Sequence, residues 1–326
     1  MSHLRLLAVL LAMTLVATAC AGPGASPAAS EAAEMPDELV IGFVPSREAD
    51  ALVETIQPVA DYLSERLGIP VEGFVSTDYT ALVTAMETGQ AQIGAFGPFS
   101  LLQARDRAGA EIILQSERFG SATYHTQFMT NNPDKYCDDE PVETDDGWLN
   151  CNGTADADEG PVAVERVSEI EPGTTVSFVE EASASGYIFP ATILIQQGLD
   201  LDQVRENAVF AGGHDTSVVA VCEGDAEVGV SFDDARGAAE TGCDVASNVV
   251  VFAYGPEIPN DGWAVLGSLP DQLKEDIKQA LLDYADSEEG QAVLESIYEI
   301  TGLVEADQEA FQIVEDAAAE LGIEGD

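Results

Sequence analysis

Positively charged side chains are scarce in this chain, which has 12 Lys and Arg residues against 60 Asp and Glu residues in 326 positions. The formal net charge of −48 repels polyanions and argues against nucleic acid and anionic membrane surfaces as partners. A site for an anionic ligand must work against this field. We therefore expect such a site to use hydroxyl groups and helix N-termini rather than guanidinium or ammonium groups.

Cysteine is also scarce, with five residues and no C-x-x-C spacing, which argues against a zinc or thioredoxin-type site. Cys20 lies near the N-terminus. The other four fall into two pairs that are close in sequence, although four cysteines allow three connectivities. The expected disulfides are Cys137 with Cys151 and Cys222 with Cys243. We expect no cofactor and no metal centre.

Long hydrophobic runs are confined to the N-terminus. The run from Leu6 to Val16 follows Arg5 and is too short to span a bilayer, which is typical of a signal peptide, here residues 1–19. The segment Ala17-Thr18-Ala19-Cys20 resembles a bacterial lipobox and marks Cys20 for lipidation, with a plain signal peptide as the alternative. Residues 20–37 are predicted to be a flexible tether. We expect an exported protein, lipid-anchored to the outer face of the cytoplasmic membrane, where disulfides can form.

Strands and helices alternate along the rest of the chain. Apolar runs predict three early strands, each followed by a helix, and this alternation indicates a mostly parallel sheet covered on both faces. The predicted strands span residues 39–44, 71–75 and 92–96. The alternation resumes at Thr174, and the C-terminal part is predicted to be helical over about 271–284, 287–299 and 306–321.

The two stretches of alternation predict an α/β protein with two lobes. Lobe 1 comprises residues 38–122 and 254–326, and lobe 2 comprises residues 123–253. Hinge strands near 123–130 and 248–254 connect the lobes. Ligands of such folds bind in the cleft between the lobes, at the carboxyl ends of the strands.

Residues 131–160 interrupt the pattern with an acidic segment rich in Asn, Asp and Gly that contains two of the cysteines. We interpret the segment as an insertion in lobe 2, closed by a disulfide. Its Asp156, Asp158 and Glu159 leave Ca²⁺ binding open as an alternative to a solvated loop, although the segment has no twelve-residue EF-hand loop.

The turn at residues 182–187 is the strongest candidate for an anion site. It has the sequence Ala-Ser-Ala-Ser-Gly-Tyr and separates a predicted buried strand, Thr174 to Glu180, from a helix that ends at Gly198. Ser183 or Ser185 can cap this helix, and its first backbone N–H groups are free to bind an anion. An ordinary capped helix is the alternative.

Three segments in order resemble the substrate-binding proteins of phosphate, phosphite and phosphonate ABC transporters, the PhnD-like family. The first is residues 183–190, in which Ser183 to Tyr187 are followed by Phe189-Pro190. The second is Gly212-Gly213-His214-Asp215, and the third is Ile258-Pro259-Asn260-Asp261. The resemblance extends over about residues 38–300, including Gly42 to Pro45, Tyr79 and Gly97-Pro98. The family's first motif is similar to Ser-Thr-Ser-Gly, and Ala184 here replaces the Thr, which removes one hydroxyl group.

The resemblance implies a type II periplasmic-binding-protein fold that closes over a tetrahedral phosphorus oxyanion, and we expect a monomeric protein without enzymatic activity. Such a protein captures a phosphonate, phosphite or phosphate and delivers it to an ABC importer permease. A sulfonate or another small oxyanion, or a ligand-sensing receptor, is the alternative. A hydrolase with a Ser-His-Asp triad is a weaker rival, because no Gly-x-Ser-x-Gly elbow is present.

The expected ligand-binding residues follow from these motifs and from the resemblance. They are Thr77, Tyr79, Tyr124, Ser183, Ser185, Gly186, Tyr187, His214, Asp233 and Asp261. The serine hydroxyls and the amides of residues 185 and 186 would hold the phosphoryl oxygens, and the helix start at residues 77–79 would close the shell from the other lobe. His214 would donate a hydrogen bond, and Tyr187 could equally be a core residue.

The acidic candidates need a positive partner. A carboxylate beside a phosphonate is costly unless a cation or a P–OH group lies between them. Asp233, Asp234 and Asp261 are therefore expected to meet a ligand ammonium or a protonated phosphorus oxygen if any of them lines the site, with ordinary surface acids as the alternative. His125 is interpreted as a structural histidine near the hinge.

Overall fold

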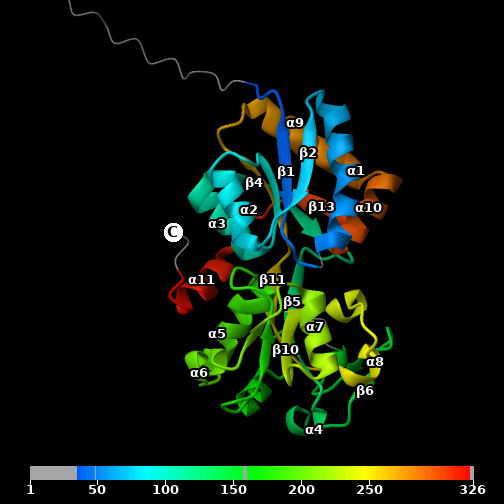
Figure 1. Ribbon diagram of the computed structural model, residues 1–326, viewed down its shortest axis with the longest axis vertical. Helices are drawn as coiled ribbons and strands as arrows, with labels where there is room; N and C mark the ends of the chain where they lie inside the picture. Colours follow the sequence, from blue (N-terminus) through cyan, green and yellow to red (C-terminus); the bar gives the residue numbers. More distant parts are fainter. Residues whose placement is uncertain (1–34, 48, 157–159, 324–326) are drawn as a thin grey trace, which may run out of the picture. The chain divides into compact units, whose positions relative to one another are not determined.

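The computed structural model describes residues 35–47, 49–156 and 160–323 (Figure 1). The predicted signal peptide, the lipidation residue Cys20 and most of the tether lie outside the described residues, as do Asp158 and Glu159 of the acidic segment. Within the described part of the chain, no helix combines the length and the apolar character needed to cross a bilayer.

The first sheet has six strands in the order β13-β4-β12-β3-β1-β2. Its strands are β1 (Leu39–Phe43), β2 (Val71–Val75), β3 (Ile93–Phe96), β4 (Ala110–Glu117), β12 (Gly262–Leu266) and β13 (Gly302–Glu305). Strands β1, β2 and β3 are parallel, whereas β12 is antiparallel to β3 and β4, and β13 is antiparallel to β4. The prediction of a mostly parallel sheet is wrong, because β12 re-enters the sheet directly from the other half of the chain without a crossover helix.

The helices of the first sheet follow the expected pattern. They are α1 (Ala49–Leu67), α2 (Tyr79–Glu87), α3 (Pro98–Ala108), α9 (Asp271–Ala285) and α10 (Glu288–Tyr298). Helix α1 buries Leu52, Ile56 and Leu63 on one face. Helix α2 begins after Asp78, whose side chain accepts a hydrogen bond from the Ala81 N–H at 2.6 Å.

The second sheet has seven strands in the order β6-β7-β11-β5-β10-β8-β9. Its strands are β5 (Thr123–Thr130), β6 (Val142–Glu143), β7 (Leu149–Asn150), β8 (Val176–Phe178), β9 (Val209–Phe210), β10 (Val228–Phe232) and β11 (Val250–Pro259). Its longer helices are α5 (Phe189–Gln196), which continues a π-helical turn η3 (Ala184–Ile188), and α7 (His214–Glu223). Shorter turns are α4 (Pro133–Tyr136), α6 (Leu201–Arg205), α8 (Val245–Asn248), η1 (Thr154–Asp156), η2 (Val164–Glu169) and η4 (Ala235–Ala238).

Two chain crossings connect the sheets. Strands β5 and β11 pair antiparallel, and next to them the Asn260 N–H donates to the Ala122 carbonyl at 2.8 Å. In the first sheet, the Ser116 N–H of β4 donates to the Asp261 carbonyl, also at 2.8 Å. Asp261 therefore lies at the junction of the two sheets.

The last helix also connects the two halves. Helix α11 (Gln312–Glu320), drawn in red in Figure 1, packs against α5 of the second sheet. The Thr192 hydroxyl donates to the Ala317 carbonyl at 3.1 Å, and Arg105 of α3 forms an ion pair with Glu315 at 2.9 Å. The helix predicted over residues 306–321 begins only at Gln312, because irregular chain and a turn occupy residues 306–311.

Both expected disulfides are present, Cys137–Cys151 and Cys222–Cys243, with Cα atoms 5.8 and 6.1 Å apart. The first disulfide closes the acidic insertion, which adds β6 and β7 to the edge of the second sheet. The side chain of Asp156, the third of the expected Ca²⁺ ligands, also lies outside the described part of the chain.

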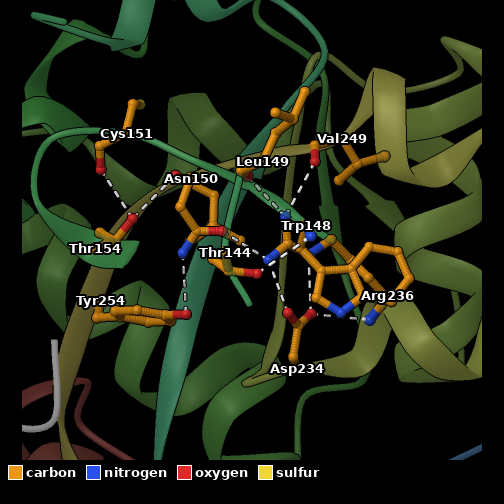
Figure 2. A network of polar contacts seen from close by, with 11 residues as sticks. Thr144, Trp148, Leu149, Asn150, Cys151, Thr154, Asp234, Arg236, Val249 and Tyr254 are labelled. Atoms are coloured by element: carbon orange, nitrogen blue, oxygen red, sulfur yellow. Dashed lines mark hydrogen bonds and ion pairs between the residues drawn. The ribbon is translucent and has the colours of Figure 1, made fainter. Parts of the chain in front are cut away.

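Arg236 attaches the insertion to the second sheet (Figure 2). Its fully buried guanidinium forms an ion pair with Asp234 at 2.7 Å. It also donates to the Leu149 carbonyl and the Asn150 amide oxygen of β7, each at 2.8 Å, and to the Val249 carbonyl at 3.2 Å. One buried cation thus joins β7 to the segments that precede η4 and β11.

Candidate functional site

A small cavity lies where the carboxyl ends of β1, β3 and β10 face the starts of several helices. Its volume is about 20 Å³, and a cavity needs roughly 10–15 Å³ to hold one water molecule. The cavity is lined by residues of both sheets and their helices. A space of this size holds about one water molecule, so a larger ligand requires the cavity to widen.

Four helices of the described chain begin at this cavity. Its wall includes Tyr79 at the start of α2, Gly97 and Pro98 at the start of α3, Ser183 at the start of η3, and His214 at the start of α7. The first N–H groups of a helix have no intrahelical acceptor, and the helix dipole adds partial positive charge there. The convergence of these helix starts favours an anion.

Ser183 and His214 form the donor group on the second sheet's side. The Ser183 hydroxyl caps its helix by accepting from the Gly186 N–H at 3.1 Å, and it lies 3.4 Å from His214 Nε2. The Phe232 N–H donates to His214 Nδ1 at 3.3 Å, so the proton of the neutral ring is on Nε2, toward Ser183 and the cavity. Burial, with the charges of Arg118 and Arg47, lowers the pKa of His214 to about 3. His214 is therefore a neutral donor at physiological pH.

Tyr79 and Tyr124 add two hydroxyl groups to the cavity wall. Both side chains are buried, and burial together with the charge of Asp261 raises the pKa of each phenol. A hydrogen bond joins the side chains of Tyr124 and Ser185 and counteracts part of this rise in the pKa of Tyr124. Both phenols keep their protons at neutral pH and can donate to an oxyanion.

Arg118 also lines the cavity, and the expectation of a site without guanidinium groups is wrong. Its side chain is 7% exposed, and Nη2 lies 2.5 Å from Asp261 Oδ2. The guanidinium carbon is 5.6 Å from the ring centre of Tyr124 and 5.1 Å from that of Phe232. Its Nε is buried and has no hydrogen-bond partner among the described residues. Arg118 belongs to no recognisable sequence motif. The small number of Lys and Arg residues in the chain was the only sequence feature that could have drawn attention to it.

Some expected residues do not line the cavity. Thr77 is exposed, and its hydroxyl donates to Asp78 at 3.2 Å. The Gly186 N–H is used by the Ser183 cap, and a Cβ at this glycine would lie 2.4 Å from the Cβ of Val179. The glycine is thus required by close packing.

Tyr187 points to a different environment from Tyr79. Its ring packs edge-on against Phe178 with centroids 5.3 Å apart, and its hydroxyl accepts from Arg205 at 2.8 Å. Of the two alternatives for Tyr187, the geometry favours the core.

Asp233 is engaged by His125 outside the cavity. It accepts the His125 backbone N–H at 2.7 Å and lies 3.2 Å from Nδ1. Burial lowers the pKa of His125, but the hydrogen bond to Asp233 and the charges of Asp233 and Glu257 outweigh burial and raise it. Asp234 is paired with Arg236 instead, so of the three acidic candidates the structure brings only Asp261 to the cavity.

Hydrogen bonds across the cleft use two of the helix-start amides. The His214 N–H donates to the Ser46 carbonyl at 3.0 Å, and the Tyr79 N–H donates to Glu180 Oε1 at 3.3 Å. Burial is the main reason why the pKa of Glu180 is raised to about 7. The donors that remain for a ligand are chiefly side chains: hydroxyls, the His214 ring and Arg118.

Comparison with known proteins identifies the family. A family model described as "ABC transporter, phosphonate, periplasmic substrate-binding protein" matches residues 41–311. The chain belongs to this family. Its members are substrate-binding components of transporters and act outside the cytoplasm.

Individual members are only distantly similar. The phosphate-import protein PhnD of Mycolicibacterium smegmatis is 25% identical over 210 residues, which cover 61% of this chain and 56% of that protein. This chain thus spans little more than half of that relative's length. A probable ABC transporter phosphite binding protein, PhnD1 of Prochlorococcus marinus, is 20% identical over 88% of this chain and 90% of its own.

The structure of the Prochlorococcus PhnD1 protein in complex with methylphosphonate is similar to this one. It has a TM-score of 0.72 at 18% identity and covers 89% of this chain and 100% of the solved chain. The expected type II periplasmic-binding-protein fold is thereby confirmed.

Proposed function

We propose that this protein captures a small phosphorus oxyanion outside the cytoplasm and delivers it to the permease of an ABC importer. The supporting observation is the cavity at which four helix starts, several hydroxyls, a neutral His214 and one guanidinium converge. We assign ligand contacts to Tyr79, Tyr124, Ser183, Ser185, His214 and Arg118. The names of the relatives add phosphate, phosphite and methylphosphonate as candidate ligands.

The number of donors is sufficient for tight binding. A hydrogen bond to a charged group contributes about 1.5–3 kcal/mol, and a micromolar dissociation constant needs about 8 kcal/mol net. Five or six such bonds supply this energy after the costs of dehydrating the anion and ordering the site. The one guanidinium adds a charge-assisted donor that the sequence argument did not include.

Titration calorimetry with phosphate, phosphite, methylphosphonate and methanesulfonate tests the ligand class. We expect at least one phosphorus oxyanion to bind with a micromolar or lower dissociation constant, and methanesulfonate to bind much more weakly. Binding of methanesulfonate alone would favour the sulfonate alternative. No binding of any of the four would overturn the proposal.

The cellular part of the proposal has its own tests. We include lipidation at Cys20, a tether over residues 20–37, lobes with the boundaries given above and a monomeric, non-catalytic protein. Cys20→Ser should release the protein from membranes, and light scattering should give the monomer mass. Deleting the gene should abolish uptake of the ligand if the partner is an importer, whereas intact uptake would favour a sensor.

A further inference from the structure

The cavity contains one ion pair, and this pair bears on which phosphorus compounds can bind. Arg118 and Asp261 are 7% and 14% exposed, and their charged atoms are 2.5 Å apart. We propose, building on the function above, that Arg118 occupies the place of a ligand cation beside Asp261. The site then selects phosphorus oxyanions with small uncharged substituents and rejects those that carry an ammonium group.

The carboxyl group of Asp261 is largely buried on the cavity wall. A buried carboxylate next to an oxyanion is unfavourable unless a positive group lies between them. In this chain the protein itself supplies that group, because Arg118 Nη2 contacts Asp261 Oδ2. The negative charge of Asp261 is already neutralised by Arg118, and the guanidinium would repel an ammonium group of the ligand.

Other carboxylates are not placed to replace Asp261. Among the described residues that line the cavity, Asp261 carries the only carboxyl group. Asp233 is bound by His125 outside the cavity, and Glu180 accepts the Tyr79 N–H. An amine-bearing ligand would therefore bring a charge into the cavity without gaining a free carboxylate as its partner.

Arg118 is fixed in this position by its neighbours. The rings of Tyr124 and Phe232 lie within 5.6 and 5.1 Å of its guanidinium carbon, which is cation–π distance. Its buried Nε–H still lacks an acceptor among the described residues and is available to a ligand oxygen. Arg118 thus neutralises Asp261 with one edge and keeps a donor for the oxyanion.

The experiment compares two ligands of the same size that differ in charge. Ethylphosphonate and aminomethylphosphonate differ only in a methyl group against an ammonium group, so the pair separates charge from volume. Methylphosphonate serves as the reference that reports whether the proposed function holds. For the wild-type protein we expect ethylphosphonate to bind at least tenfold more tightly than aminomethylphosphonate, and equal or reversed affinities would overturn the inference.

Variants make the test independent of ligand size. Arg118→Met should weaken methylphosphonate binding and should improve the affinity for aminomethylphosphonate at least tenfold relative to the wild type, because Asp261 becomes free. Adding Asp261→Asn to Arg118→Met should abolish this gain. Arg47→Met removes a nearby cation that is paired with Glu299 at 3.1 Å, and should not reverse the preference.

These measurements distinguish failure of the selectivity inference from failure of the proposed function. If the wild type binds methylphosphonate but Arg118→Met gains no affinity for aminomethylphosphonate, the selectivity inference fails and the proposed function stands. If the wild type binds no phosphorus oxyanion, the proposed function fails. Retention of the wild-type melting temperature and of residual methylphosphonate binding shows that Arg118→Met is folded.

Discussion

Tyr79 and Tyr187 illustrate how much depends on the position of a single side chain. Both are 2% exposed, and both belong to segments that resemble the family. Tyr79 lines the cavity, whereas Tyr187 packs on Phe178 and accepts from Arg205. Sequence could not separate them, because the direction in which a residue near a helix start points is set by tertiary packing.

These two tyrosines form a matched pair for mutation. Tyr79→Phe removes a donor at the cavity and should weaken oxyanion binding about tenfold or more. Tyr187→Phe should leave the affinity unchanged, because its hydroxyl accepts from Arg205 instead. Calorimetric titration of both variants checks this, and equal losses of affinity would contradict the assignment. Ser183→Ala is a less clean test, because it also removes a helix cap worth about 1 kcal/mol.

Arg118 shows where reasoning from the sequence failed. The motif residues Ser183, Ser185 and His214 were predicted because hydroxyls and glycines at helix starts have a local chemical meaning. Arg118 follows β4 in a segment without any motif, and it reaches the cavity only because the chain crosses between the sheets there. The net charge of −48 is a sum over the whole sequence and gives no information about the position of a single buried cation.

At the scale of secondary structure, elements with strong local signals were predicted well. Strands β1, β2 and β3 and helices α9 and α10 begin and end within one residue of their predicted limits, since apolar runs and helical periodicity define them. Strand β13, with the sequence Gly-Leu-Val-Glu, was missed because four residues carry too little pattern to distinguish a strand from a helix. Antiparallel pairing of β12 was also unforeseen, because pairing depends on residues distant in sequence.

Arg236 should stabilise the attachment of the insertion to the second sheet. Arg236→Met leaves Asp234 without its cation and removes the guanidinium donors to Leu149, Asn150 and Val249, so we expect the free energy of unfolding to fall by about 3 kcal/mol. Urea denaturation measures this loss. Faster proteolysis within residues 131–160 should accompany it.

The control for Arg236 is an exposed ion pair. Arg66 pairs with Asp283 at 2.6 Å, with side chains 52% and 39% exposed. Pairs of this kind contribute little, so Arg66→Met should cost much less stability than Arg236→Met. Similar losses for both variants would show that the buried network of Figure 2 does not anchor the insertion.

At the scale of the whole molecule, the Glu180 side chain forms a hydrogen bond that links the two sheets. Glu180 follows β8 of the second sheet and accepts the first N–H of α2 on the first. Burial, and to a lesser extent the charges of Asp78 and Glu181, raise its pKa to about 7, while the hydrogen bonds from Tyr79 and Ala182 lower it. The folded state therefore favours the protonated carboxyl group.

This raised pKa predicts a pH dependence with a definite sign. The stability that Glu180 contributes is fully present below its unfolded pKa of about 4.3 and is lost as the pH rises through about 7. Glu180→Gln cannot ionise, so its stability relative to the wild type should increase between pH 4.5 and 7.5. Urea denaturation of both proteins at a series of pH values measures the difference. A difference that does not change with pH would contradict the prediction.

The pairing of all four cysteines in the described part of the chain has a practical consequence. With Cys20 replaced, a cysteine introduced at the exposed Thr77 would carry the one reactive thiol of the protein. That position is two residues from Tyr79 on the cavity wall, so an environment-sensitive fluorophore attached there would report capture of the proposed oxyanion. Under the proposed function, the labelled protein would serve as an optical sensor of that oxyanion.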